Sequence, residues 1–227
     1  MTESETFWLG DKILENLKRK LVLEEDDFVA RKVALKWRDP FKIIVAVILS
    51  QNTIEKNTLK AYMKLEKNVG ISPNAISSTS PEKIKNLIRI AGLQESKARA
   101  IKELARIIVE KFNGKPEKLL KMGEEEIREL LNSIPGIGRK TIDVFLANFG
   151  YPVLPIDVHI RRVSLRLGLA KSKSYEKMQR ELHKVFRPEK RLDAHMYLIK
   201  LGRTYCKALK PNCKHCPLNS ICPKIIE

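Results

Sequence analysis

The sequence lacks a long hydrophobic run, a secretory leader and, before residue 206, any cysteine. Its longest unbroken apolar stretch runs from Ile43 to Leu49, whereas a membrane-spanning helix needs about 20 apolar residues. The acidic start, Met1 to Glu5, has no hydrophobic segment of the kind that a signal peptide contains. We therefore expect a protein of the cytoplasm that crosses no membrane.

Aromatic residues make up only 6% of the chain, and segments that alternate polar and apolar residues are almost absent. Aromatic residues and such alternation are typical of strands, so their scarcity predicts an all-α protein. Phe41 to Ser50 is apolar nearly all round, which predicts a buried central helix. Other helices are expected over 81–91, 124–133 and 139–149, after Asp157, after Ser174, and over 193–204.

Ser96 to Phe112 has apolar residues at steps of three and four, which predicts a long amphipathic helix. Asn113-Gly114 and the following Pro116 would end it. We expect Ala100, Ile101, Leu104, Ile107 and Ile108 on its inner face, and Lys97, Arg99, Lys102 and Glu103 largely outside.

Positive charge is in clear excess, because 44 Lys and Arg stand against 27 Asp and Glu, a formal net charge of +17. Such a field attracts polyanions, and nucleic acid gains affinity because each neutralised phosphate releases counterions. A Lys-rich composition of the heat-adapted type is the alternative, and the presence of only three Gln fits it. A membrane surface is disfavoured, because the basic residues are spread along the chain rather than gathered in one helix.

A tight turn with two alternating glycines, Pro135-Gly136-Ile137-Gly138, is followed directly by Arg139 and Lys140. Glycine allows the backbone to turn sharply and to approach a ligand closely. The N–H groups at the start of the next helix attract anions. We therefore predict that Gly136, Gly138 and Arg139 contact the DNA backbone, which holds the duplex without reading its sequence. A helix–turn–helix connection without a ligand is the alternative.

Lys140 falls in the first turn of the predicted helix, where the helix dipole disfavours a cation. An unfavourable position of this kind indicates a functional reason. The helix N-terminus and the neighbouring Arg139 both lower the pKa of a lysine, and a lysine of lowered pKa can form a Schiff base. A phosphate contact explains the position equally well, so both roles stay open at this point.

Asp157 follows a short apolar stretch and is a natural N-cap for a helix that begins at Val158. A carboxylate can also stabilise an oxocarbenium-like sugar or move protons during attack at an anomeric carbon. Asp157 is therefore the second candidate catalytic residue, together with Lys140. His159 is expected to pack against its neighbours rather than to act in catalysis.

All four cysteines lie near the end of the chain, with the spacing Cys206-x6-Cys213-x2-Cys216-x5-Cys222. In an intracellular protein such a cluster indicates a metal site rather than disulfides. Four thiolates suit zinc or an iron–sulfur cluster. The spacing alone does not separate the two, although it differs from the paired Cys-x2-Cys of zinc ribbons.

Taken together, Pro135 to Thr141, Asp157 to His159 and the cysteine pattern resemble the endonuclease III family, the bifunctional DNA glycosylases of the helix-hairpin-helix superfamily. The likeness extends over about residues 30 to 224 and includes Phe41 to Thr53 and Ala91 to Lys97. The resemblance implies an all-α fold of two helical lobes that flank a DNA cleft. One lobe, 33–152, would be a six-helix barrel with the helix-hairpin-helix. The other, 1–32 and 153–227, would hold a [4Fe–4S] cluster, with zinc as the alternative.

Residue roles follow from the same resemblance. Lys140 corresponds to the Schiff-base nucleophile and Asp157 to the essential carboxylate. Gln51 and Leu93 correspond to residues that fill the gap in the duplex, and Lys97 is assigned to the DNA contacts with them. The cluster ligands would be Cys206, Cys213, Cys216 and Cys222.

The implied activity is base excision repair of oxidised pyrimidines in duplex DNA. Lys140 would attack C1′ of a nucleotide flipped out of the stack, release the base, and cut the strand 3′ to the abasic site by β-elimination. The partner would be double-stranded DNA with a damaged base or an abasic site, bound by a monomer associated with the nucleoid. One alternative is a mismatch-specific glycosylase that removes thymine or uracil opposite guanine. Another is a non-catalytic DNA-binding protein with the same hairpin and metal site.

Two features depart from the family pattern. Asp143 stands where the resemblance implies a neutral residue in the hairpin helix. Gln51-Asn52-Thr53 is followed by Ile54 and Glu55, where small residues and Asp are usual. The second region borders the expected base pocket, so the resemblance does not fix the preferred base.

Overall fold

The computed structural model describes residues 3–225, and within them the chain forms helices, turns and irregular segments but no strand. The predicted all-α class is confirmed. The chain divides into two compact units, one of residues Glu25–Phe149 and one made of Met1–Glu24 with Gly150–Glu227. The first begins before helix α2 (Val29–Trp37), which the predicted bound at residue 33 would divide. The assignment of lobes 33–152 and 1–32 with 153–227 stays a prediction.

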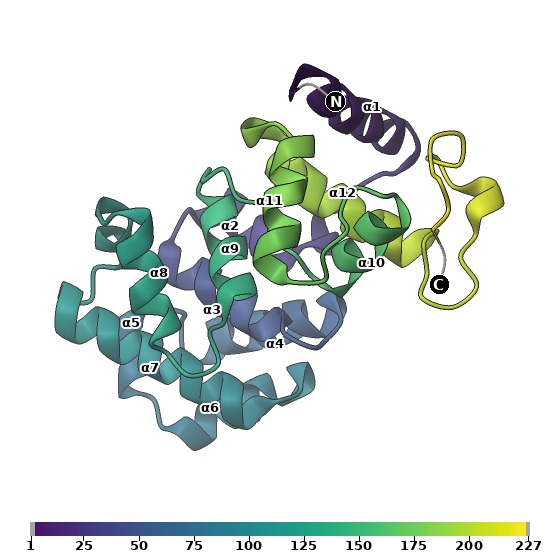
Figure 1. The fold of residues 1–227 in the computed structure, drawn as a ribbon. Coiled ribbons are helices and arrows are strands. Elements are labelled where there is room, and N and C mark those ends of the chain that lie inside the picture. Colours follow the sequence, from purple (N-terminus) through teal and green to yellow (C-terminus); the bar gives the residue numbers. More distant parts are fainter. Residues whose placement is uncertain (1–2, 226–227) are drawn as a thin grey trace. The chain divides into compact units, whose positions relative to one another are not determined.

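The unit Glu25–Phe149 is a set of helices joined by short turns (Figure 1). Helices α2 and α4 (Glu55–Asn68), for which the sequence predicts no bounds, pack against α3 (Pro40–Ser50). The α-helices are α2 (Val29–Trp37), α3 (Pro40–Ser50), α4 (Glu55–Asn68), α5 (Pro73–Ser78), α6 (Pro81–Ile88), α7 (Gln94–Phe112), α8 (Glu124–Asn132) and α9 (Arg139–Asn148), with short 3-10 turns at Glu25–Asp27, Arg89–Ala91 and Pro116–Lys121.

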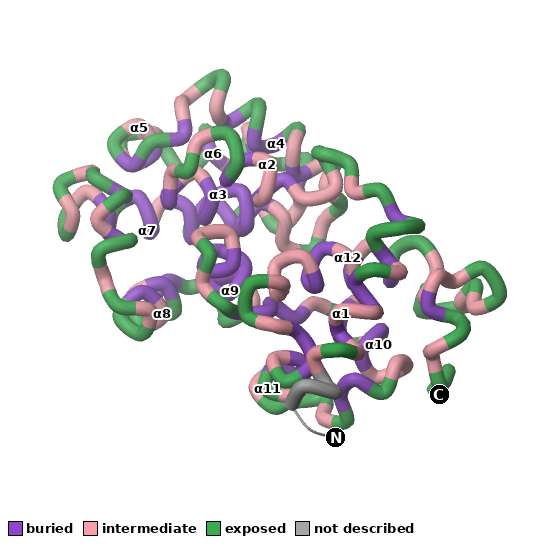
Figure 2. Tube along the Cα trace, turned by 90° about the horizontal axis from the view of Figure 1, so that it is seen from above, coloured by how far each residue is buried: buried purple, intermediate pink, exposed green. Residues whose placement is uncertain are grey.

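Helix α3 lies at the centre of this unit. It is buried from Pro40 to Leu49 except at Lys42, as its mostly purple colour in Figure 2 shows, and it packs against α2, α4, α7 and α9. Asp39 begins the helix, because its side chain accepts a hydrogen bond of 3.1 Å from the N–H of Lys42. The prediction of a buried central helix is confirmed, and α3 provides the rigid base on which the hairpin helix α9 rests.

The remaining helices form the other unit. Helix α1 packs on α11 and α12, and α10 packs on α12. Gly202 allows the last pair to approach closely, since a Cβ at this position would lie 2.9 Å from the Cβ of His159. The bounds are α1 (Glu3–Lys20), α10 (Val158–Arg166), α11 (Tyr175–Val185) and α12 (Arg191–Thr204), with 3-10 turns at Pro188–Lys190 and Cys213–His215.

The last residues of this unit, drawn in yellow in Figure 1, are mostly irregular. Among 206–225, only Leu218 is buried. No helix within residues 3–225 is both long enough and apolar enough to cross a bilayer.

Candidate active site

The turn between α8 and α9 is the predicted hairpin. Gly136 has a φ of +94°, which side chains other than hydrogen rarely allow. Two buried isoleucines hold the turn, and the N–H of Ile137 donates to the carbonyl oxygen of Ile134 at 3.0 Å. A Cβ at Gly136 would lie 3.5 Å from that of Ala100, so the turn also rests on α7. The hairpin is therefore a fixed structure rather than a loose loop.

Lys140 is the second residue of α9 and is half-buried. The helix behind it is buried from Thr141 to Ala147, which fixes the backbone that carries the lysine. Gly136, Gly138 and Arg139 in front of it are exposed, as a contact with a DNA backbone requires. Their binding to phosphate stays a prediction.

Gln51 connects the end of α3 to the hairpin. Its Nε2 donates to the carbonyl oxygen of Gly136 at 2.9 Å and to Oγ1 of Thr141 at 3.0 Å. Thr141 directly follows Lys140, so the residue predicted to enter the duplex is bound, without DNA, beside the candidate nucleophile. Its insertion into the duplex stays a prediction.

Leu93 is an exposed apolar residue in a strained backbone conformation. Its φ is +49°, a region that leucine rarely adopts, and 52% of its surface is exposed. It directly precedes α7. Strained and exposed residues of this kind gather at functional sites, which supports the predicted contact with the duplex.

The position predicted for Lys97 is wrong. This side chain is 1% exposed, and its Nζ donates to the carbonyl oxygens of Leu49 at 2.9 Å and of Ala91 at 2.8 Å. Burial lowers its pKa to about 8. The periodicity of α7 already places Lys97 on the face of Ala100 and Leu104, but its charge argued for the outside. A buried ammonium is not placed to contact phosphate, so its assignment as a DNA contact is withdrawn.

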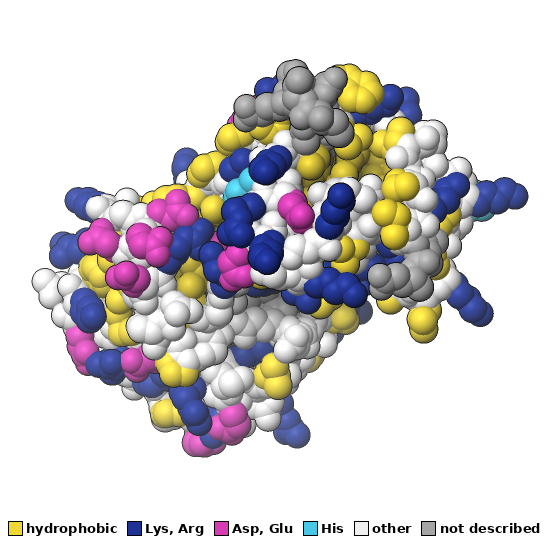
Figure 3. All heavy atoms as spheres, in the orientation of Figure 1, with side chains coloured by type: hydrophobic (Ala, Val, Ile, Leu, Met, Phe, Trp, Pro, Cys, Tyr) yellow, Lys and Arg dark blue, Asp and Glu magenta, His cyan; other side chains and the backbone are white. Residues whose placement is uncertain are grey.

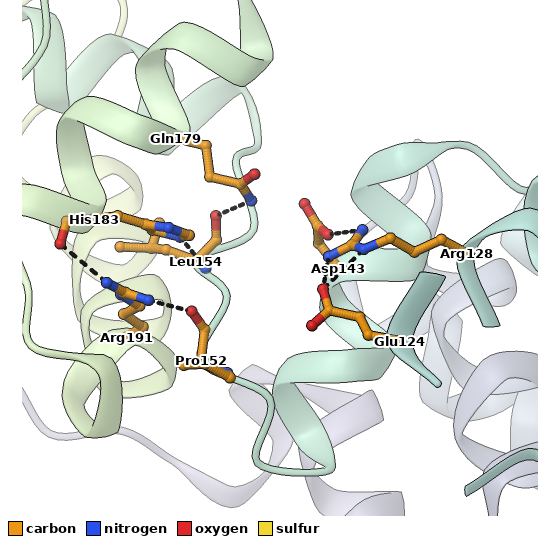
Figure 4. Close-up of polar contacts among 8 residues, drawn as sticks. All are labelled: Glu124, Arg128, Asp143, Pro152, Leu154, Gln179, His183 and Arg191. Carbon is orange, nitrogen blue, oxygen red and sulfur yellow. Dashed lines mark hydrogen bonds and ion pairs between the residues drawn. The ribbon is translucent and has the colours of Figure 1, made fainter. Parts of the chain in front are cut away.

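Asp143 forms a buried ion pair that sequence reasoning did not foresee. Its carboxylate is fully buried and accepts a hydrogen bond of 2.7 Å from Nη1 of Arg128, which also bonds Glu124 at 2.7 Å through Nη2 (Figure 4). Burial opposes the charge on Arg128, but the two carboxylates outweigh it, and the pKa of the guanidinium is raised. The unusual Asp143 is therefore compensated from α8, and the pair joins the two helices of the hairpin.

Asp157 belongs to the other unit and begins α10. Its Oδ1 accepts a hydrogen bond of 2.8 Å from the N–H of Ile160, which confirms the predicted N-cap. The extended segment before it is pinned at Leu154, whose N–H donates to Nε2 of His183 at 3.1 Å and whose carbonyl accepts from Nε2 of Gln179 at 3.0 Å (Figure 4). The backbone that leads to Asp157 is therefore held through both the N–H and the carbonyl of Leu154.

The four cysteines are brought to one place. Together with Arg166, they line a small cavity of about 30 Å³. Nη1 of Arg166 lies 3.6 Å from Sγ of Cys206, and the N–H of Lys224 donates to Sγ of Cys222 at 3.3 Å. Burial raises the pKa of Cys216 and Cys222, and the neighbouring thiols raise it further. Within residues 3–225, however, no three Cys, His, Asp or Glu side chains form an assembled metal centre.

This donor set fits a metal group. Four thiols that repel one another as thiolates need a positive centre to hold them deprotonated together. The guanidinium of Arg166 and the backbone N–H of Lys224 supply the outer contacts that commonly support such ligands. Four thiolates are ligands of the kind that zinc and iron–sulfur clusters bind. The residues that line the cavity do not distinguish between the two groups.

Comparisons with known proteins give the family. Residues 45–188 match the model of the HhH-GPD superfamily base excision DNA repair protein. Endonuclease III of Sulfolobus acidocaldarius is 36% identical over 222 residues, which cover 96% of this chain and 97% of that protein. The chain belongs to the endonuclease III family. Endonuclease III of Escherichia coli (strain K12) is also 36% identical, over 83% of this chain and 85% of its own.

Solved structures support the same family. A trapped endonuclease III–DNA covalent intermediate has a TM-score of 0.76 and 28% identity, and the match covers 99% of this chain and 97% of that one. A thermostable thymine-DNA glycosylase has a TM-score of 0.73 at 24% identity, over 97% and 96%, which shows a shared fold. Membership of the endonuclease III family and the all-α fold are thus established together.

For this endonuclease III family member, the structure brings some of the predicted residues together. The segments of Gln51, Leu93 and Lys97 meet within Glu25–Phe149, and the cysteines meet in the other unit. Lys140 and Asp157 belong to different units, and their joint role stays a prediction. Sequence reasoning missed Arg128. The signal for it was Asp143 itself, since a carboxylate in an apolar helix needs a cation nearby.

Proposed function

We propose that this protein is a base excision repair DNA glycosylase with AP lyase activity that removes oxidised pyrimidines from duplex DNA. The observation that carries the proposal is the half-buried Lys140 in the first turn of α9, directly behind an exposed glycine hairpin. An amine at the base of a phosphate-binding turn is placed to meet a sugar once the adjacent phosphates are held. The similar structure trapped as a covalent complex with DNA supports a covalent mechanism.

In the proposed reaction, the amine of Lys140 attacks C1′ of a flipped nucleotide. The C1′–N bond breaks, the base leaves with its electron pair, and ring opening gives an imine between Lys140 and the sugar. The imine acidifies the hydrogens at C2′, so loss of one proton expels the 3′ phosphate by β-elimination. Asp157 is proposed to stabilise the positive charge that develops on the sugar. Its N-cap bond to Ile160 would hold the carboxylate in one orientation.

Double-stranded DNA would be held mainly through its phosphates. The exposed Gly136, Gly138 and Arg139 are the proposed contacts at the hairpin, and Gln51 and Leu93 the residues that fill the space of the flipped nucleotide. Lys and Arg side chains are scattered over the face drawn in Figure 3, among hydrophobic and acidic side chains, and the net charge is +17. Binding should weaken steeply with salt. An enzyme of this kind is expected to work as a monomer in the cytoplasm, on the nucleoid.

The cysteines are the proposed ligands of a [4Fe–4S] cluster, with zinc as the alternative. When bound, the group would supply structure, because all four of its positions are filled by protein. Arg166 would balance part of its negative charge near Cys206. A coloured protein with a broad absorbance band at the violet-blue edge supports iron and sulfur, whereas a colourless protein that contains zinc supports the alternative.

Borohydride trapping tests the proposal. Wild-type protein and Lys140→Gln are incubated with a thymine-glycol duplex and, separately, with a T·G mismatch duplex, and covalent adducts are counted on a denaturing gel. We expect an adduct on thymine glycol with the wild type only. Lys140→Gln should keep DNA affinity within several-fold, because the hairpin contacts remain.

The outcomes separate the candidate functions. An adduct mainly on the T·G duplex would move the protein to the mismatch class. Base loss without any adduct would exclude Lys140 as the nucleophile. Binding without base loss on either duplex would favour a non-catalytic DNA-binding protein.

A further inference from the structure

Lys97 joins the two segments that carry the proposed gap-filling residues. Its ammonium donates to the carbonyl oxygen of Leu49, two residues before Gln51, and to that of Ala91, two residues before Leu93. One nitrogen therefore fixes the distance between two backbone segments that are 42 residues apart in sequence (91 − 49 = 42). Both bonds lie in the interior of the unit, where water does not compete for the carbonyls.

The position of this ammonium follows from helix ends. Leu49 lies in the last turn of α3, and Ala91 ends the short 3-10 turn Arg89–Ala91. Carbonyls at helix ends have no partner within the helix, and a cation is favoured there. An apolar side chain in place of Lys97 would leave both carbonyls buried without this donor. The lysine is thus suited to hold two helix ends at once.

The connection continues from α3 to the hairpin. Gln51, which follows α3, donates to Gly136 and to Thr141, and Thr141 is the neighbour of Lys140. On the other side, Leu93 keeps a positive φ of 49°, a strained state that persists only when the surroundings fix it. The bond from Lys97 holds the carbonyl of Ala91, two residues before Leu93. A row of hydrogen bonds therefore runs from the segment of Leu93 to the first turn of α9.

We propose that Lys97 is a positioning residue for base extrusion. It holds the segments of Gln51 and Leu93 at the spacing that lets both side chains enter the duplex when a nucleotide leaves it. The inference rests on the proposed function, since it assigns Gln51 and Leu93 to the gap. It replaces the DNA contact that the resemblance implied for this lysine.

Lys102 provides a matched control. It lies on the same helix α7, and its half-buried ammonium also bonds backbone carbonyls at a helix end, those of Ile76 at 3.2 Å, Ser77 at 2.7 Å and Thr79 at 2.8 Å. None of these segments carries a proposed gap-filling residue. A change of Lys102 to Met therefore removes a similar set of bonds but leaves the segments of Gln51 and Leu93 tied together.

The test compares Lys97→Met and Lys102→Met on two substrates. One is a duplex with thymine glycol and 2-aminopurine opposite the lesion, whose fluorescence reports unstacking. The other is a single-stranded oligonucleotide with a preformed abasic site, where no gap needs filling. We expect Lys97→Met to slow base removal from the duplex about ten- to a hundredfold and to reduce the fluorescence rise, because small misplacements have such effects. Cleavage of the single strand should stay within about threefold, as should both activities of Lys102→Met.

A double-mutant cycle separates positioning from a general effect on the fold. In a Gln51→Ala/Leu93→Ala background, Lys97→Met should cost no more than about threefold on the duplex, because the side chains that it positions are gone. An equal loss on both substrates, or an undiminished loss in this background, would overturn the inference. Should Lys97→Met fail to fold, Lys97→Arg is measured. It should slow the duplex reaction selectively, and wild-type rates on both substrates would contradict the proposal.

Failure of the proposed function would look different. The wild type would then cleave neither substrate, whatever stands at position 97. If the wild type cleaves both and the two Met variants behave alike, the function stands and the role of Lys97 falls.

Discussion

The hairpin between α8 and α9 is held by buried protein contacts, whereas the cysteine-rich tail has almost none. Ile134 and Ile137 are buried under the turn, and α9 is buried from Thr141 to Ala147. In the tail, residues 206–225, Leu218 alone is buried. The hairpin region carries the proposed nucleophile, and the tail carries the proposed cluster ligands. Because only the hairpin region is largely buried, the two regions differ in what makes them rigid.

This difference has a physical origin. The hairpin lies on α3 and α7, whose side chains bury enough apolar surface to offset the entropy of ordering it. The tail has little apolar surface to bury, so its order would depend on the proposed bonds between its sulfur atoms and a metal group. We therefore expect changes in the two regions to destabilise different units of the molecule.

The largest effect is expected from Cys216→Ser. Loss of one of four thiolates should release the metal group and destabilise the unit that contains the tail by at least about 4 kcal/mol, because such sites contribute directly to folding. Visible absorbance, metal content and thermal unfolding of the purified variant measure this. Hydrogen exchange of α3 and α9, followed in the same sample, should stay protected.

Asn219→Ser is the control for this change. Asn219 lines the same cavity but supplies no sulfur, so the variant should keep its metal and its melting temperature. Equal losses in both variants would mean that the cavity is held by packing. Loss of protection in α9 along with the tail would show that the two regions do not differ as argued.

Arg128→Met is expected to have the next largest effect, in the opposite region. It removes the guanidinium that pairs with the fully buried carboxylate of Asp143, and breaking a buried pair in this way costs about 3–5 kcal/mol. Urea unfolding followed by circular dichroism gives the free energy of unfolding, and the metal content should not change. The loss should appear as reduced hydrogen-exchange protection of α8 and α9.

A second substitution makes this prediction specific to the charge. Arg128→Met combined with Asp143→Asn removes both charges, so most of the stability should return. If the double variant is as unstable as Arg128→Met, packing of the guanidinium rather than the charge of Asp143 holds α8 against α9.

The features that the sequence predicts correctly depend on residues that are neighbours in the chain. The turn at Gly136, the N-cap at Asp157 and the buried run that became α3 are local, because each is set by the chemistry of a few adjacent positions. The bounds of α8 and α9 agree with the prediction to within one residue, since Gly123 and Gly138 begin them.

The features that sequence reasoning missed depend on residues far apart in the chain. Lys97 was placed outside because a cation is rarely buried, and its partners Leu49 and Ala91 are backbone carbonyls that no pattern marks. Arg128 and Asp143 are 15 residues apart, and only the packing of α8 on α9 shows that they meet. Whether Lys140 and Asp157 act on one sugar also depends on tertiary structure, and it stays a prediction.

The smallest expected effect concerns the pH dependence of stability at Lys97. Burial lowers its pKa from an ordinary 10.5 to about 8. Between these values the unfolded chain holds a proton that the folded protein has released, so the free energy of unfolding should rise with pH. Wild type should therefore gain about 1–3 kcal/mol relative to Lys97→Met between pH 7 and pH 10.5. Urea unfolding of both proteins across this range measures the difference. If the free energies of unfolding of the two proteins changed with pH in parallel, the ammonium of Lys97 would not be desolvated. Its hydrogen bonds to Leu49 and Ala91 would then lie in a hydrated part of the unit.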